Sequence, residues 1–275
     1  MTTAPPLIEP FFLNGGADEV FALYRGPESP ERAVLILPPF AEEMNKSRRM
    51  LTLLAEGLAA AGTGTLLVDL HGTGDSHGDF RDARWQTWVQ DLLNGVEWLR
   101  RRGVASVSLL GFRMGALLAP ALIAETAVQR LALWQPVVSG ETLLTQFLRL
   151  RLASGMLDSQ RERESTKDLR RRLTEGEGLE VAGYTLSPEL CAALDAQRLA
   201  DAEPATLPPV DWFEFVGDPS RGLSPGSRRL AERWSEAGAS VATHPLKGQA
   251  FWSTTEITVE PELVSATVAA LGEAR

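Results

Sequence analysis

The chain of 275 residues contains little cysteine and little histidine, with one Cys and three His. The single thiol, Cys191, excludes an intramolecular disulfide, and no other Cys or clustered His stands near it at the spacing of metal ligands. We therefore expect Cys191 to be a buried apolar residue. We also expect no metal and no other cofactor.

Positive charge is scarce as well, because 27 Lys and Arg residues face 36 Asp and Glu residues and leave a net charge of −9. Such a charge balance does not attract nucleic acid or anionic lipid, so we expect neither as a partner. The N-terminus lacks the basic start and apolar run of a secretory signal, and the longest apolar tract, 107–124, is interrupted by Arg113 and Pro120. We expect a cytoplasmic protein without a membrane span, and the sequence leaves its oligomeric state open.

Hydrophobic residues make up 44% of the chain, which is typical of a globular protein. Short apolar runs alternate with helix-length amphipathic segments, and this pattern predicts an α/β fold with a mainly parallel sheet and helices on both faces. The turn residues at 14–16 predict an antiparallel hairpin at the edge of the sheet. The expected strands lie near 10–14, 19–25, 33–38, 64–70, 105–110, 130–135, 212–216 and 239–244, and the expected helices near 45–61, 84–102, 115–126, 226–237 and 260–271.

The segment 140–205 departs from this pattern because it is helical and charged and has no clear strand. We expect it to be a helical lid inserted into a core made of residues 1–139 and 206–275. Its charged stretch at 161–172 is typical of a solvated helix face, with an anion-binding patch as the alternative. Apolar positions at helical spacing either pack the lid onto the sheet or line an acyl tunnel. These positions are Leu143, Leu144, Phe147, Leu148 and Leu152.

A strand, a five-residue turn and a helix follow one another at 107–119, with glycines at positions 111 and 115. This is the layout of the nucleophile elbow of α/β-hydrolases, where glycines flank the tip because larger side chains would collide with the neighbouring strand and helix. The tip residue here is Arg113. A guanidinium stays protonated and cannot attack a carbonyl, so no acyl-enzyme can form at this position. Arg113 can instead bind an anion at the start of the helix, or it can be occupied by an ion pair.

A literal Gly-x-Ser-x-Gly sequence occurs elsewhere, with Ser76 at its centre. No helix follows it directly, and it falls one strand–helix unit too early for an elbow. The segment 69–76 instead fits the Asp-x-x-Gly-x-Gly-x-Ser turn that is a common structural loop of α/β-hydrolases. We therefore expect Ser76 to be structural.

Of the other two members of a Ser-His-Asp triad, the acid has a residue at its expected position and the base has none. Asp218 follows the strand after the lid, where the acid is expected, although an Asp before Pro is also ordinary turn chemistry. No histidine follows Gly248, where the base is expected. His244 comes before that loop, and His71 and His77 stand on a much earlier one, so all three are weak candidates. Ordinary Ser-His-Asp hydrolysis is therefore not expected.

The loop after the third predicted strand is unusually charged. α/β-hydrolases place oxyanion-hole donors in this loop, which converges with the elbow at the carboxyl edge of the sheet. We expect Glu42 or Glu43 to pair with Arg113. The alternative is structural: the helix dipole favours carboxylates at a helix start, and arginines such as Arg48 follow one or two turns later, at a spacing that allows helical ion pairs. Gln135, which closes a strand, should point to the same rim. The expected polar cleft consists of Glu42, Glu43, Asn45, Arg113, Gln135 and Asp218.

With these segments the sequence resembles the second of the two α/β-hydrolase families associated with the exosortase A system of Gram-negative bacteria. The resemblance rests on blocks at 38–49, 69–80, 84–91 and 251–252, of which the first is long and unusual. It implies a cytoplasmic protein of the α/β-hydrolase fold, encoded with exopolysaccharide and protein-sorting machinery and named a hydrolase without an assigned substrate. It also implies that Arg113 is a feature of the family.

Three functions remain open, and they differ in the partner: a small acyl substrate, an anionic ligand or another protein. In the first, the protein hydrolyses an ester or thioester or transfers its acyl group, with water activated by Glu42 or Glu43 and the oxyanion or an anionic group bound by Arg113. In the second, an inactive relative binds an anionic lipid or polysaccharide intermediate. In the third, ion pairs close the cleft and the chain acts through protein contacts. The expected catalytic residues are Arg113, Glu42, Glu43 and Asp218, and the expected substrate-binding residues are Phe40, Asn45, Gln135 and Trp252.

Overall fold

The computed structural model describes residues 6–13, 19–155 and 164–272, which contain an eight-stranded sheet with the order β1-β2-β4-β3-β5-β6-β9-β10. β1 pairs antiparallel with β2, and β2 with β4, whereas every other neighbouring pair is parallel. The strands are β1 (Leu7–Leu13), β2 (Val20–Gly26), β3 (Arg32–Leu37), β4 (Gly64–Val68), β5 (Ser106–Phe112), β6 (Leu131–Trp134), β9 (Val210–Phe215) and β10 (Val241–Leu246).

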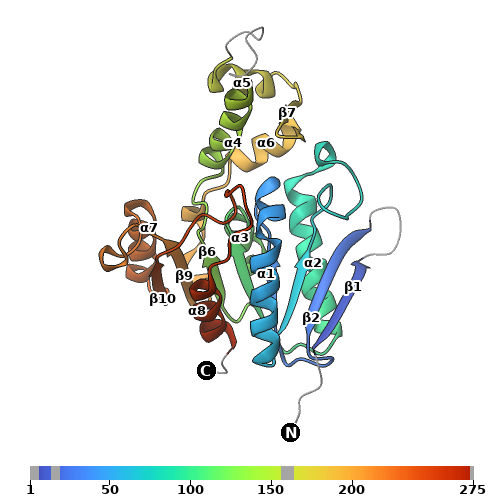
Figure 1. Cartoon of the computed structure of the whole chain (residues 1–275), viewed down its shortest axis with the longest axis vertical. Helices are drawn as coiled ribbons and strands as arrows, with labels where there is room; N and C mark the ends of the chain where they lie inside the picture. Colours follow the sequence, from blue (N-terminus) through green and yellow to red (C-terminus); the bar gives the residue numbers. More distant parts are fainter. Residues whose placement is uncertain (1–5, 14–18, 156–163, 273–275) are drawn as a thin grey trace.

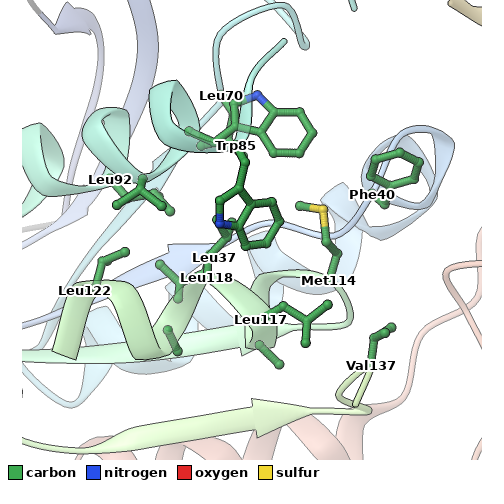
Figure 2. Packing of buried hydrophobic residues seen from close by; sticks show 14 of the residues in the cluster. Leu37, Phe40, Leu70, Trp85, Leu92, Met114, Leu117, Leu118, Leu122 and Val137 are labelled. Atoms are coloured by element: carbon green, nitrogen blue, oxygen red, sulfur yellow. The ribbon is translucent and has the colours of Figure 1, made fainter. Parts of the chain in front are cut away.

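Helices cover both faces of this sheet (Figure 1). Successive strand residues point to opposite faces, so Ile36 packs in the layer of α1 and α8, and Leu37 packs in the layer of α2, α3 and α7. The helices are α1 (Glu42–Ala60), α2 (Trp85–Arg101), α3 (Gly115–Glu125), α7 (Pro225–Glu236) and α8 (Pro261–Gly272), with short 3₁₀ turns η1 (Phe80–Asp82) and η4 (Pro219–Arg221) in the loops. Figure 2 shows the second layer from close by, with Phe40 and Met114 at its edge.

The α/β class and every strand and helix predicted for the core are confirmed. The antiparallel hairpin at the edge of the sheet is also present as β1 and β2, while its turn residues at 14–16 lie outside the described residues. α1 begins at Glu42, three residues before the predicted start at 45, so Glu42 and Glu43 form its first turn. Carboxylates are favoured there by the helix dipole.

Between β6 and β9 the chain leaves the sheet and forms a group of elements that we call the insert. The insert stands over the end of the sheet at which α1 begins (Figure 1). Its elements are α4 (Gly140–Gly155), α5 (Thr166–Thr174), β7 (Leu179–Val181), β8 (Tyr184–Leu186), α6 (Pro188–Asp195), η2 (Leu199–Asp201) and η3 (Pro204–Thr206).

The expectation that 140–205 contains no strand is wrong, because β7 and β8 form an antiparallel hairpin there. Its two-residue turn consists of Ala182 and Gly183, which both have positive φ angles, 50° and 85°. Positive φ at both central positions is the requirement of a type I′ hairpin turn. The sequence signal was weak because each strand has three residues and the turn lacks the usual Asn or Asp.

Burial confirms the expectation for Cys191, whose side chain lies in the main apolar cluster and whose thiol pKa burial raises to about 12. The charged stretch predicted at 161–172 is described from residue 164, and α5 carries the exposed ion pair Arg171–Asp168 there. Residues 161–163 lie outside the described residues. No helix in the described part of the chain is long and apolar enough to cross a membrane.

The turn between β5 and α3 is possible only because glycines flank it. A Cβ atom on Gly115 would stand 1.9 Å from the carbonyl oxygen of Leu37 in β3, and one on Gly111 would stand 2.8 Å from the Cα atom of Ala116. Both neighbours are backbone atoms, which cannot move aside without shifting the sheet or the helix. The reason predicted for the two glycines is therefore confirmed.

We predict that Gly115→Ala destabilises the protein by about 3 kcal/mol or more, because the new methyl group overlaps the backbone of β3. Thermal or urea unfolding followed by circular dichroism measures this change. Gly217→Ala is the matched control, since a Cβ atom at Gly217 meets nothing within 4 Å. It should change the stability by no more than about 0.5 kcal/mol. Equal stability of the two variants would contradict the explanation.

Candidate active site

Arg113 occupies the tip of the elbow in a left-handed backbone conformation, with a φ angle of 53°. Its N–H donates a hydrogen bond to the carbonyl oxygen of Trp134 at 3.0 Å, and its own carbonyl accepts one from the N–H of Val137 at 3.1 Å. These bonds fix the tip to the end of β6. The chain thus projects a fully charged arginine where a hydrolase of this layout carries its nucleophile.

Three residues with strained backbones gather around this tip. Ala41, Arg113 and Gln135 have φ angles of 52°, 53° and 41°, and they follow the neighbouring strands β3, β5 and β6. Residues other than glycine rarely adopt such angles, and the strain of about 1–3 kcal/mol each is typical of functional sites. The strain therefore marks the carboxyl edge of these three strands as the candidate site.

A partly buried ion pair joins the elbow to the first turn of α1. The Nε and Nη2 atoms of Arg113 donate to Oε1 of Glu43 at 3.1 and 3.0 Å, and 15% of each side chain is exposed. The Nη1 atom reaches the carbonyl oxygen of Gln135 at 3.5 Å, and the indole ring of Trp252 covers the guanidinium, with its centre 5.1 Å away. The expected pairing of a loop carboxylate with Arg113 is therefore found, and the partner is Glu43.

Both bonds from Arg113 end on the same oxygen of Glu43, Oε1. The other oxygen, Oε2, is buried and has no hydrogen-bond partner among the described residues. Burial raises the pKa of Glu43 above its usual value, against the lowering effect of Arg113, and the nearby charge of Glu42 raises it further. A carboxylate with a raised pKa is a stronger base than a free one, so Glu43 can accept a proton from water.

A cavity of about 300 Å³, which we call the elbow cavity, lies between this ion pair and the insert. Its charged side chains are those of Arg113, Glu43, Glu42 and Lys46. Burial raises the pKa of Glu42 as well, against the lowering effect of Lys46. The insert side of the cavity is formed by α4, which contributes three apolar side chains one turn apart. These are Leu143, Phe147 and Leu150. Leu144 and Leu148 are buried in the apolar cluster instead, and Leu152 packs against that cluster.

The structure separates the remaining predicted residues. Phe40 and Trp252 also line the elbow cavity, whereas Asn45 lines a second cavity. Gln135 lines neither of these two cavities, and its Oε1 atom accepts from the N–H of Phe215 at 2.8 Å. Asp218 is exposed and caps η4 by accepting from the N–H of Ser220 at 3.1 Å, which is the turn role that its neighbouring proline suggested.

The structure also gives local roles to Ser76 and His244, two of the residues weighed as alternatives. The Oγ atom of Ser76 donates to the carbonyl oxygen of Asp69 and accepts from the N–H of Phe21, so Ser76 is structural as expected. His244 bonds through Nε2 to Asp211 at 2.9 Å and stacks on Phe213 in the sheet. The described residues include no group of three or more His, Cys, Asp or Glu side chains that could hold a metal.

Sequence reasoning missed a second cavity of about 430 Å³, which we call the polar cavity. Arg48 reaches across it from α1 and donates through Nη2 to the buried carboxylate of Asp69 at 3.0 and 3.2 Å. This pair replaces the helical pair with Glu42 or Glu43 that the spacing allowed. Tyr184 of the missed hairpin completes the cavity, and its hydroxyl accepts from Asn45 at 3.5 Å.

Comparison with solved structures shows that the chain has the α/β-hydrolase fold. It is similar to Est1E from Butyrivibrio proteoclasticus with bound ferulic acid, with 15% identity, a TM-score of 0.67 and coverage of 95% of this chain and 96% of that one. A Pyrobaculum calidifontis esterase has 16% identity, a TM-score of 0.60 and coverage of 97% and 84%. The proline iminopeptidase of Mycobacterium smegmatis has 16% identity, a TM-score of 0.57 and coverage of 96% and 97%. No family model and no curated protein sequence matches the chain.

We predict that the protein is not labelled by a fluorophosphonate probe that modifies the activated serine of serine hydrolases. The tip residue Arg113 offers no hydroxyl, and the hydroxyl of Ser76 is held between two backbone groups. Intact-mass spectrometry after incubation checks this, with a serine esterase as the positive control. A stoichiometric adduct on Ser76 would contradict the structural role given to that residue.

Proposed function

We propose that the protein is a hydrolase of ester or thioester bonds in which a water molecule, activated by Glu43, replaces the serine nucleophile. The observation that carries this proposal is the geometry of Glu43, a residue that lines the elbow cavity. Its Oε1 atom is held by Arg113, while its buried Oε2 atom has no hydrogen-bond partner among the described residues. An oriented carboxylate with one unoccupied oxygen is what a general base needs.

In this reaction Glu43 removes a proton from water as the water oxygen bonds to the carbonyl carbon. The tetrahedral intermediate then expels the alcohol or thiol, which takes up the proton held by Glu43, and a carboxylic acid is left. The negative charge on the carbonyl oxygen is stabilised by Arg113 together with backbone N–H groups of the elbow and the β3 loop. Met114, directly after the tip, and Ala41 supply those N–H groups in the layout of this fold.

The acyl group fits the apolar side of the elbow cavity. Leu143, Phe147 and Leu150 of α4 line it, and Phe40 and Trp252 add aromatic walls. The insert acts as a lid in this proposal, because it supplies most of the apolar contacts and covers the site from water. The resemblance to exosortase-associated hydrolases supports a cytoplasmic enzyme that works beside exopolysaccharide and protein-sorting machinery.

The ion pair between Arg113 and Glu43 also agrees with a closed, inactive cleft, but the elbow cavity beside it favours a ligand. The alternative is therefore a protein that binds an anionic lipid or polysaccharide intermediate and does not convert it, which the cationic tip favours. For this alternative, octanoate should raise the melting temperature of the wild type by several degrees and that of Arg113→Gln much less, without any ester turnover. Differential scanning fluorimetry measures both shifts.

We predict that Glu43→Gln lowers kcat/KM about 100-fold or more for whichever p-nitrophenyl or coenzyme A acyl ester the wild type hydrolyses best. Glutamine can still accept the bonds from Arg113 but cannot take a proton from water. Glu42→Gln tests the neighbouring carboxylate, and Asp218→Asn is the control outside the cavity. A Glu43→Gln rate equal to that of the wild type would refute the proposal, as would a full loss in Asp218→Asn.

We also predict that log(kcat/KM) rises with pH with unit slope and levels off above a pKa higher than the usual value of a glutamic acid. The base works only when ionised, and burial raises the pKa of Glu43. The charge of Glu42 contributes to that rise, so Glu42→Gln should shift the inflection to lower pH. Initial rates between pH 4 and 9 measure the inflection, and a shift in the opposite direction would exclude Glu43 as the titrating group.

A further inference from the structure

The polar cavity and the elbow cavity lie on two sides of Phe40, which lines both. Ala41 and Met114 line the polar cavity. In the chain, Ala41 precedes Glu42 and Met114 follows Arg113, and both of these neighbours line the elbow cavity. The two cavities therefore meet at the backbone that would hold the reacting carbonyl. If the proposed function is right, the acyl half of an ester occupies the elbow cavity and the other half points into the polar cavity.

Several polar groups of the polar cavity are not used by the protein itself. Arg48 is fixed to Asp69 through Nη2 alone, so its Nε and Nη1 atoms have no partner among the described residues. Asp75 is a solvent-exposed residue that lines the cavity, and its carboxylate accepts no hydrogen bond from a described residue. Only the backbone N–H of Asp75 is engaged, and it donates to Asp69 at 3.1 Å. Asn45 and the Tyr184 hydroxyl add an amide and a hydroxyl. The cavity thus offers donors and acceptors together.

The charges of the cavity indicate which ligand these groups suit. The charge of Arg48 is cancelled by Asp69, and Asp75 leaves one negative charge. A phosphate or carboxylate would meet this excess of negative charge, so an anion is disfavoured. A neutral group with several hydroxyls can donate to Asp75 and accept from Arg48 at the same time.

The apolar part of the cavity fits the same kind of ligand. Phe40, Phe80 and Trp88 form an aromatic wall in which Phe40 packs edge-on against the other two rings. The C–H faces of a sugar ring or of glycerol pack on such a wall while their hydroxyls face the polar groups. We propose that the polar cavity binds the alcohol half of the substrate and that this half is a neutral, hydroxyl-rich group such as a glycerol or sugar unit.

The first test measures binding without turnover. Methyl β-D-glucopyranoside and glycerol are titrated against the full chain and followed by saturation-transfer NMR, with gluconate as the anionic probe. Asp75→Ala should weaken binding of the neutral probe about tenfold, because a hydrogen bond to a charged group is lost. Tyr184→Phe removes one hydroxyl, keeps the ring beside Phe80 and should weaken it less. Asp218→Ala is the control, since that carboxylate is exposed like Asp75 but lines neither cavity.

The second test compares kcat/KM for glycerol monobutyrate and ethyl butyrate. The wild type should prefer the glycerol ester, and Asp75→Ala should reduce that preference, the ratio of the two kcat/KM values, about tenfold. Failure of the wild type to bind either neutral probe, or stronger binding of gluconate, would overturn the assignment of the cavity. Binding of the neutral probes without hydrolysis of any ester would support the cavity and refute only the proposed hydrolysis.

Discussion

The ion pair between Arg113 and Glu43 is the interaction on which the candidate site depends. It ties the elbow after β5 to the first turn of α1 across two adjacent parallel strands, in a place where both side chains are 15% exposed. Removing one partner of such a pair leaves a buried charge and costs about 3–5 kcal/mol, although the pair stabilises the fold little relative to apolar residues. Its main effect is therefore to fix the position of Glu43.

The shape of the elbow is independent of its chemistry. The approach of Gly115 to the backbone of β3 and the bonds from Arg113 to β6 define the sharp turn, and neither involves a nucleophilic side chain. An arginine at the tip is therefore compatible with the whole fold. In the proposed reaction the reactive group stands away from the tip, since the only carboxylate bonded to the tip among the described residues is that of Glu43 in the first turn of α1.

The elements of the core could be predicted because local patterns determine them: apolar runs for the strands, amphipathic periods for the helices and paired glycines for the elbow. The pairing of Arg113 with a loop glutamate could also be predicted, because parallel strands bring their carboxyl ends to one edge. The choice of Glu43 over Glu42 could not, since it depends on which residue of the first helical turn faces the elbow. The polar cavity was missed because Arg48, Asp69 and Tyr184 come from three distant segments.

The missed hairpin matters for the site more than its length suggests. Tyr184 of β8 packs edge-on against Phe80 with ring centres 5.0 Å apart, and Phe80 in turn packs against Phe40 between the two cavities. Phe147 of α4 also packs edge-on against Phe40, at 5.0 Å. Phe147 of the insert therefore contacts Phe40 directly, whereas Tyr184 reaches it through Phe80. Because Phe40 lines both cavities, a movement of the insert that displaces this ring would change both cavities together. In the proposed hydrolysis, such a movement would couple the site of the acyl half to that of the alcohol half.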